Sequence, residues 1–494
     1  MEIKFQSKKI GSLACCVDRH MTQEQTQEVR LPDSMPDIGK VLTAWGKPVI
    51  RTKEWQNSNM TVCGGVMCWV VYMPEDGTDI RTLETWIPFQ MKWDFDENQH
   101  DGYIFAVPAL KNVDARSTSA RKMMVRVNVS VWGRAMINTE TESYCADDLP
   151  DDVQVLQADY PMELCKEAGE VLVHMDEEIP FADIQPFPEK ILRQDMHLTV
   201  NEQRVMGSRL VFRGEGRLHI SYLNDGKVYG VDFDLPFSQY ADLNGDYSQA
   251  ATAQIVPVVT NLELERKEES LSVKCEMAAQ YIIFDREMLC LAEDAYSIER
   301  NVTLHNAKLH LCSILDRRVV QTMVEQDISM EAERIADVCC TCDLPRYQQN
   351  GQITLPCQMQ ILYYDLQGSL QSVNHRMEHV LQIPGDGDVT LDAVIRSMEH
   401  PRLTLHGQQV NVAMKLELDT SAYAETGQWM VTGLDLGEPQ KNERGRPSLI
   451  LQRFHDSRLW DTAKNCGSTV AAIRHTNGFE GEPEFGCMLL IPVS

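Results

Sequence analysis

The chain has 494 residues, of which 43% are hydrophobic, a share that suits several packed cores and is too high for a disordered chain. At roughly 150 residues per domain, this length predicts about three domains. The formal net charge of −27 argues against a general nucleic-acid binder, which needs a basic surface, and against docking on an anionic membrane.

The sequence shows no sign of a membrane span. No apolar stretch approaches the roughly 18 residues that a spanning helix needs. The segment from Met1 to His20 carries lysines without the apolar core of a secretory signal. We therefore expect no membrane insertion, and we expect the protein to stay in the cell that makes it.

The first distinctive motif is Leu-Pro-Asp-Ser-Met-Pro-Asp-Ile at residues 31–38. Its two Pro-Asp steps favour an extended, turn-rich entry. Asp37 suits the N-cap of a short helix, which we predict over Ile38–Leu42. Asp33 and Asp37 offer too few oxygen ligands for calcium, so the motif does not predict a cation site.

Strand-like hairpins follow. The run Met60–Tyr72 ends at the turn Pro74–Gly77, and Leu83–Phe89 comes next. A second hairpin joins Arg209–Tyr222 to Val228–Phe237 through Asn-Asp-Gly. Apolar, β-branched and aromatic runs separated by such turns are typical of antiparallel strands.

The hairpins recur in the same order, which indicates an internal repeat. Ile87-Pro88-Phe89 closes the first and Leu235-Pro236-Phe237 the second, and a weaker third copy runs from Gln358–Tyr364 to Met377–Ile383. A pair of alternating strands follows each hairpin. The fold class we predict is mainly β, with three repeated antiparallel β domains at residues 1–150, 151–291 and 292–437. The alternative is that any β-rich chain shows hairpins at some spacing.

Fifteen cysteines are scattered along the chain. Their number is odd, and without a secretory signal reduced thiols serving as small apolar residues are the expected state. Cys339, Cys340 and Cys342 form the tightest cluster, but no second ligand pair follows at zinc-ribbon spacing. The sequence therefore predicts no metal site.

Residues 438–448 read as a linker, because they combine two prolines, a glycine and several charges with no apolar run. A small α+β segment follows at 449–494. Leu459, Trp460 and Ala463 fall on one helical face, Gly467 suits the end of that helix, and Ser468 suits the cap of the next.

This segment resembles a LysM module, a strand-helix-helix-strand fold. The resemblance rests on Leu449–Phe454, Leu459–Lys464, Gly467–Val470, Asn477-Gly478 and Met488–Pro492. LysM modules commonly bind N-acetylglucosamine glycans, such as peptidoglycan, through two loops. The resemblance marks as candidate ligand or partner positions Ser457, Arg458, Asn477, Gly478 and Phe479.

The first of those loops departs from the family pattern. Asp456-Ser457-Arg458 stands where LysM modules usually carry Gly-Asp-Thr or Gly-Asp-Ser. Arg458 adds a bulky charge beside the expected glycan groove. Two interpretations follow: a LysM that binds peptidoglycan, and a LysM fold that is structural or docks protein.

The rest of the chain resembles the SPOCS domain of endospore-forming bacteria. The residues that carry this resemblance are the 31–38 motif, Tyr72, Ile87–Phe89, Arg121–Arg126 and Asp294–Ser297. Repeated SPOCS units followed by one LysM are similar to a family of spore-coat morphogenetic proteins of clostridia.

That family resemblance implies a function in sporulation. It implies a scaffold for coat assembly, located in the mother-cell cytoplasm at the forespore surface, whose partner is a SpoIVA-like coat-basement ATPase. It implies no enzymatic activity and no cofactor.

The sequence shows none of the common catalytic motifs. It has no G-x-S-x-G elbow, no H-E-x-x-H and no Gly-rich phosphate loop after a strand, and its histidines are dispersed. An enzyme assembled from distant residues is a third interpretation beside the scaffold and the wall binder. We prefer the non-enzymatic scaffold, which needs only binding surfaces.

Overall fold

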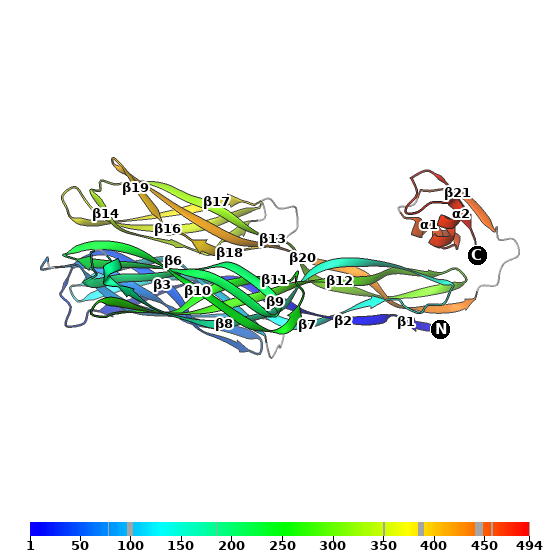
Figure 1. Ribbon diagram of the computed structural model, residues 1–494, viewed down its shortest axis with the longest axis horizontal. Coiled ribbons are helices and arrows are strands. Elements are labelled where there is room, and N and C mark those ends of the chain that lie inside the picture. Colours follow the sequence, from blue (N-terminus) through cyan, green and yellow to red (C-terminus); the bar gives the residue numbers. More distant parts are fainter. Residues whose placement is uncertain are drawn as a thin grey trace.

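The computed structural model describes residues 1–77, 79–95, 102–184, 186–348, 351–383, 390–439, 448–455 and 458–493, without the side chains of 310–313, 390 and 424–426. Most of this chain forms antiparallel strands, which confirms the mainly β class. Figure 1 shows an elongated molecule in which long strands run along its length and a small helical module sits at one tip. None of the described helices is long and apolar enough to cross a membrane.

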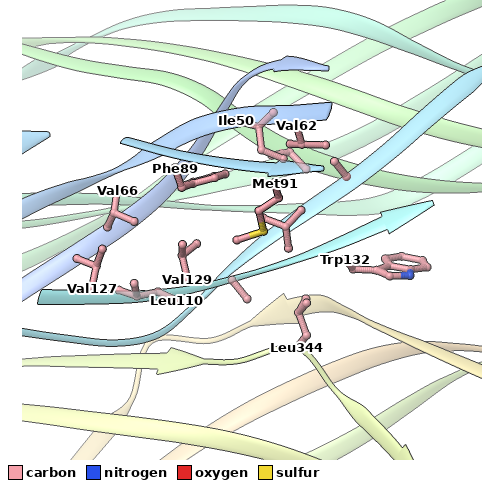
Figure 2. Close-up of a cluster of buried hydrophobic side chains, with 14 of the residues drawn as sticks. Ile50, Val62, Val66, Phe89, Met91, Leu110, Val127, Val129, Trp132 and Leu344 are labelled. Carbon is pink, nitrogen blue, oxygen red and sulfur yellow. The ribbon is translucent and has the colours of Figure 1, made fainter. Parts of the chain in front are cut away.

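The first β block spans residues 6–145. Its strands are β2 (Gln6–Arg30), β3 (Ile38–Gln56), β4 (Asn59–Pro74), β5 (Arg81–Asp94), β6 (Tyr103–Ser119) and β7 (Lys122–Cys145). They form two sheets, β2-β7-β6 and β3-β4-β5. Alternation along β7 places Val125, Val127 and Val129 in the core, fully buried against Val62 and Val66 of β4. Figure 2 shows this core.

The second β block spans residues 153–297. Its strands are β8 (Val153–Pro180), β9 (Lys190–Asn224), β10 (Lys227–Tyr247), β11 (Thr252–Arg266) and β12 (Ser270–Ser297), with a single 3-10 turn, η1 (Phe181–Asp183). The sheet β11-β12-β8 faces the pair β10-β9. Gly207, whose φ is +62°, divides β9, and β10 pairs only with the part from Gly207 onward.

The third β block spans residues 300–439. Its strands are β13 (Arg300–Ser329), β14 (Arg334–Cys342), β15 (Arg346–Gln348), β16 (Gln352–Tyr364), β17 (Leu370–Gln382), β18 (Thr390–Met398), β19 (Arg402–His406) and β20 (Gln409–Pro439). β16 pairs with β14, β15 and β17, while β20 pairs with β13 on one side and with β18, β19 and the N-terminal β1 (Glu2–Lys4) on the other.

The same pairing pattern recurs in the three blocks. In each, the long first strand pairs with the long last strand, which also pairs with the strand or strands just before it. A register shift also recurs at the same place. It falls at Lys111 in β6, Thr260 in β11 and Arg396 in β18. Such bulges bend a strand locally, so the blocks share a distortion as well as an order of strands.

The prediction of a helix over Ile38–Leu42 is wrong, because these residues form the start of a strand. β3 begins at Ile38, whose N–H donates to the carbonyl oxygen of Ala120 at 2.8 Å, and Ile38 and Lys40 pair with β4. Asp37 does not cap a helix; its carboxylate accepts from Arg121 at 2.9 Å. Cross-strand pairing satisfies the same backbone groups along a much longer element, so it overrides the local cap signal.

The three blocks meet around a cavity of about 190 Å³, lined by β3, β6, β9, β11, β14 and β18. Figure 2 shows Leu344, from the third block, beneath the core of the first. Each pair of blocks is also joined by at least one ion pair between largely buried side chains. These are Lys47–Asp195 at 2.7 Å (first and second), Arg193–Asp337 at 3.3 Å (second and third) and Arg134–Asp392 (first and third).

Beyond the sheets, three two-stranded ribbons continue side by side toward the tip that carries both ends of the chain (Figure 1). They are β2/β7, β8/β12 and β13/β20. We call their outer parts the stalk, residues 6–15, 136–145, 153–164, 285–297, 300–309 and 427–439. Its interior is apolar, with buried Ile10, Leu164, Leu291, Leu309 and Met430.

A C-terminal module follows the segment at 440–447, and that segment lies outside the described residues. It consists of β21 (Leu449–Arg453), α1 (Leu459–Cys466), α2 (Val470–Asn477) and β22 (Met488–Pro492), in the predicted order. Gly467 ends α1 in the left-handed conformation. Thr469, not Ser468, caps α2: its hydroxyl accepts from the Ala472 N–H at 3.0 Å, whereas Ser468 is fully buried.

None of the cysteines that the structure describes forms a disulfide bond. Cys339, Cys340 and Cys342 lie buried on β14, and the sulfur of Cys342 is 3.1 Å from that of Cys357 on β16. Burial raises the pKa of Cys339 to about 11, which keeps this thiol protonated and unreactive.

Candidate partner-docking module

The C-terminal module rests on the tip of the stalk through an aromatic contact. The rings of Tyr296 from β12 and Trp460 from α1 meet edge to face at 4.8 Å. The Tyr296 hydroxyl donates to the Ser468 carbonyl oxygen at 2.8 Å. Burial raises the pKa of Tyr296, so the hydroxyl stays a donor. Leu156 and Ile298 extend this contact into the core of the module.

Two acidic residues of β12 hold the same helix. Asp294 accepts from the Trp460 indole N–H at 2.8 Å and from the Lys464 ammonium at 2.7 Å. Glu293 pairs with Arg458 at 3.0 Å. Glu293 is the extra residue of a bulge between Ala292 and Asp294. In a regular strand two successive side chains point to opposite faces, and the bulge lets both carboxylates reach α1.

The structure describes only one of the two candidate positions in the first loop, Ser457 and Arg458. Ser457 lies outside the described residues. Arg458 immediately precedes α1, and its pairing with Glu293 raises its pKa. The side chain expected to face a glycan is therefore held by the stalk.

The predicted positions in the second loop lie together at the end of α2. The Asn477 amide donates to the Leu490 carbonyl oxygen at 2.6 Å and accepts from the Leu490 N–H at 2.8 Å, which ties α2 to β22. Gly478, with φ +72°, ends the helix. Phe479 is half-buried against the module core. All three positions contribute to the internal structure of the module.

Glu482 joins the two loops, a link that the sequence analysis missed. Its carboxylate accepts from the Leu459 N–H at 2.6 Å, at the N-terminus of α1. The adjoining Gly481 carbonyl oxygen accepts from Arg474 at 3.0 Å. A carboxylate at a helix N-terminus satisfies free N–H groups and suits the helix dipole. A Glu 23 residues after the helix start carries no local capping signal, because only folding brings the two together.

The outward side of the two-stranded sheet is apolar and exposed. Leu451 of β21 and Leu490 of β22 are direct cross-strand partners, with 63% and 39% of their surfaces exposed. Leu449 and Met488 are about half exposed. We call these four residues the outer apolar face. The alternate residues Ile450, Leu489 and Ile491 point inward to the helices. In the sequence, the continuous apolar run of β22 indicated this face, because helices cover only one side of the two-stranded sheet and every second apolar side chain is left on the other side.

Comparison with known proteins finds one family. Residues 188–267 match the family model described as SipL, SPOCS domain. The match covers the turn before β9, then the whole of β9, β10 and β11, all within the second block. No curated protein and no solved structure matched the chain. The match supports the SPOCS family for this segment.

Proposed function

We propose that this chain is a non-enzymatic scaffold for spore-coat assembly. In this proposal three SPOCS-like domains at 1–150, 151–291 and 292–437 form a rigid body, and a LysM-like module at 449–494 docks a SpoIVA-like coat-basement ATPase. The site of action is the forespore surface, in the mother-cell cytoplasm. The observation that carries the proposal is the SPOCS match at 188–267.

The recurrent architecture supports extending that match to the other blocks. All three share the pairing of first and last strands and the bulge at Lys111, Thr260 and Arg396. Three such blocks joined by buried ion pairs suit a body that holds a binding module at a fixed place. A scaffold needs this geometry and needs no catalytic cluster.

The module presents one side to the stalk and another to solvent. Helix α1 uses Trp460 and Lys464 to contact β12, so this side is occupied within the chain. The outer apolar face is uncovered, and exposed apolar patches of this kind mark protein interaction sites. We assign this face to the coat-basement partner.

Peptidoglycan binding through the same module is the alternative function. It requires Arg458 and Asn477 to be available to a glycan, but Arg458 is paired with Glu293 and Asn477 with Leu490. These contacts favour the protein-docking interpretation.

The first test is the position of a fluorescent fusion in a sporulating cell. A shell of fluorescence around the forespore is expected. Diffuse fluorescence, or signal on the vegetative wall, would contradict the coat scaffold and favour the glycan binder or an enzyme.

The second test is capture of the coat-basement ATPase by purified chain. Deleting residues 449–494 should abolish capture while the β blocks stay folded. Leu451→Glu should weaken capture at least tenfold, because it places a charge in the centre of the outer apolar face. Leu366→Glu is the matched control, since Leu366 is 62% exposed on the third block and should leave capture unchanged. Equal capture by both variants would remove this face from the interface.

A further inference from the structure

Two histidines and one aspartate meet where the second and third blocks touch. His219 lies on β9 and Asp232 on β10, paired strands of the second block, while His400 lies between β18 and β19 of the third. One nitrogen of each histidine and one oxygen of Asp232 lie within 4.8 Å of one another. We propose that these three side chains form a transition-metal site, best suited to Zn²⁺, that joins the second block to the third. This inference is independent of the proposed coat function.

The distances to Asp232 support the proposal. Oδ1 of Asp232 is 2.7 Å from Nδ1 of His219 and 3.8 Å from Nδ1 of His400. A metal ion at about 2.0–2.2 Å from each ligand fits among atoms at these separations after small shifts. Two imidazoles and one carboxylate are borderline nitrogen and oxygen ligands, a set that suits zinc with a water as the fourth ligand.

The second ring nitrogen of His219 contacts a buried carboxylate. Nε2 lies 2.9 Å from Oδ1 of Asp337, a residue of the third block that is almost fully buried. Arg193 at 3.3 Å and the Ser221 hydroxyl hold the other carboxylate oxygen of Asp337. Metal-bound histidines commonly donate their free N–H to such a carboxylate, which fixes the orientation of the ring.

Space beside His219 is kept open by Gly230 on β10. A Cβ atom at this position would lie 3.1 Å from Cε1 of His219 and 3.4 Å from Oδ1 of Asp337. Any larger residue would push on the histidine and its buried carboxylate together. The φ of Gly230 is not in the left-handed region, so the close approach to the His219 ring, and not backbone strain, disfavours a side chain here.

Metal binding requires two adjustments. The rings of His219 and His400 stack at 4.4 Å and 15°, so the His400 ring must turn to bring its nitrogen into line with the metal. His219 must release the Nδ1 proton that it shares with Asp232.

The test is zinc binding by the full chain, measured by titration calorimetry and by metal content after gel filtration. We expect one Zn²⁺ per chain and a melting temperature several degrees higher with zinc. Both effects should disappear in His400→Gln and in Asp232→Asn. His174→Gln is the control, since His174 is an exposed histidine on β8 that should keep both effects.

A spectroscopic measurement distinguishes a metal site with defined coordination from nonspecific binding at the surface. Co²⁺ in place of Zn²⁺ should give the strong visible absorption of a four-coordinate ion, absent from His400→Gln. Circular dichroism checks that each variant is folded. The proposal is overturned if the folded wild-type chain binds no zinc, or if both site variants still bind one zinc per chain.

Discussion

The contacts between the three β blocks and the contact between the stalk and the C-terminal module are built differently. Between blocks, the charged groups are removed from water: the side chains of Arg193 and Asp337 are 3% and 2% exposed. At the module, Arg458 is 58% exposed and Lys464 39%. The aromatic pair Tyr296–Trp460 is the buried part of that contact.

This difference in burial determines how strongly each contact is weakened when one of its residues is substituted. A buried charge that loses its partner keeps its desolvation penalty, so a single change destabilises the whole body. Exposed ion pairs contribute little, so the module contact depends on its aromatic pair and its hydrogen bonds. We therefore expect the three blocks to resist separation and the module to be released from the stalk more easily.

The largest expected effect is therefore in the body. Arg134 on β7 is 5% exposed, donates to Asp18 at 2.9 Å and pairs with Asp392 of the third block. Arg134→Met leaves two carboxylates without their cation and should lower the free energy of unfolding by about 3–5 kcal/mol. Urea denaturation of the full chain measures this loss.

Arg126→Met is the matched control for Arg134→Met. Arg126 lies on the same strand and pairs with Asp114, but it is 47% exposed. Its loss should cost about 0–1 kcal/mol. If the two variants lose similar stability, the buried pair is not what holds the blocks together.

The next effect is in the module. Trp460 is 8% exposed and donates to Asp294. Trp460→Ala should destabilise the module by about 3 kcal/mol, because a buried aromatic ring is replaced by a cavity. Proteolysis should then cut residues 449–494 while the body stays intact. Trp429→Ala, at a 64% exposed position on β20, should keep the wild-type cleavage pattern.

A smaller change tests the contact between the module and the stalk without unfolding the module. Tyr296→Phe keeps the ring against Trp460 and removes the hydroxyl that donates to Ser468. The loss of one hydrogen bond should weaken the binding of the module to the stalk by about 1 kcal/mol. Förster transfer between a dye on the body and one on the module should report the released fraction. Unchanged transfer would show that the hydroxyl does not hold the module.

Local patterns predicted the elements well and their partners poorly. The hairpin Met60–Phe89, the order of the C-terminal elements and the helix end at Gly467 followed from alternation, turns and capping. The helix at Ile38–Leu42 was predicted wrongly, because strand pairing overrides a local cap signal. Elements depend on neighbouring residues, whereas pairing depends on the whole fold.

The candidate site shows the same limit. Arg458 and Asn477 were named from their loops, yet their partners Glu293 and Leu490 become visible only in the folded chain. Arg134 and Asp392 are more than 250 residues apart in sequence, and no periodicity connects them. A bulge such as that at Glu293 depends on strand register, which the pattern of apolar residues does not encode.

The smallest expected effect concerns pH and the body alone. Burial lowers the pKa of His197 on β9, with Lys47 adding to the shift, although Asp195 lies 3.1 Å away. A histidine whose pKa is lower in the folded state binds fewer protons there than in the unfolded chain, so stability falls as the pH drops below about 6.5. Urea midpoints measured from pH 7 to pH 5 should decline for the wild type and decline less for His197→Gln. His305→Gln, a change at an exposed histidine of β13, is the comparison variant. A His197→Gln slope equal to that of the wild type would mean that His197 does not cause the decline.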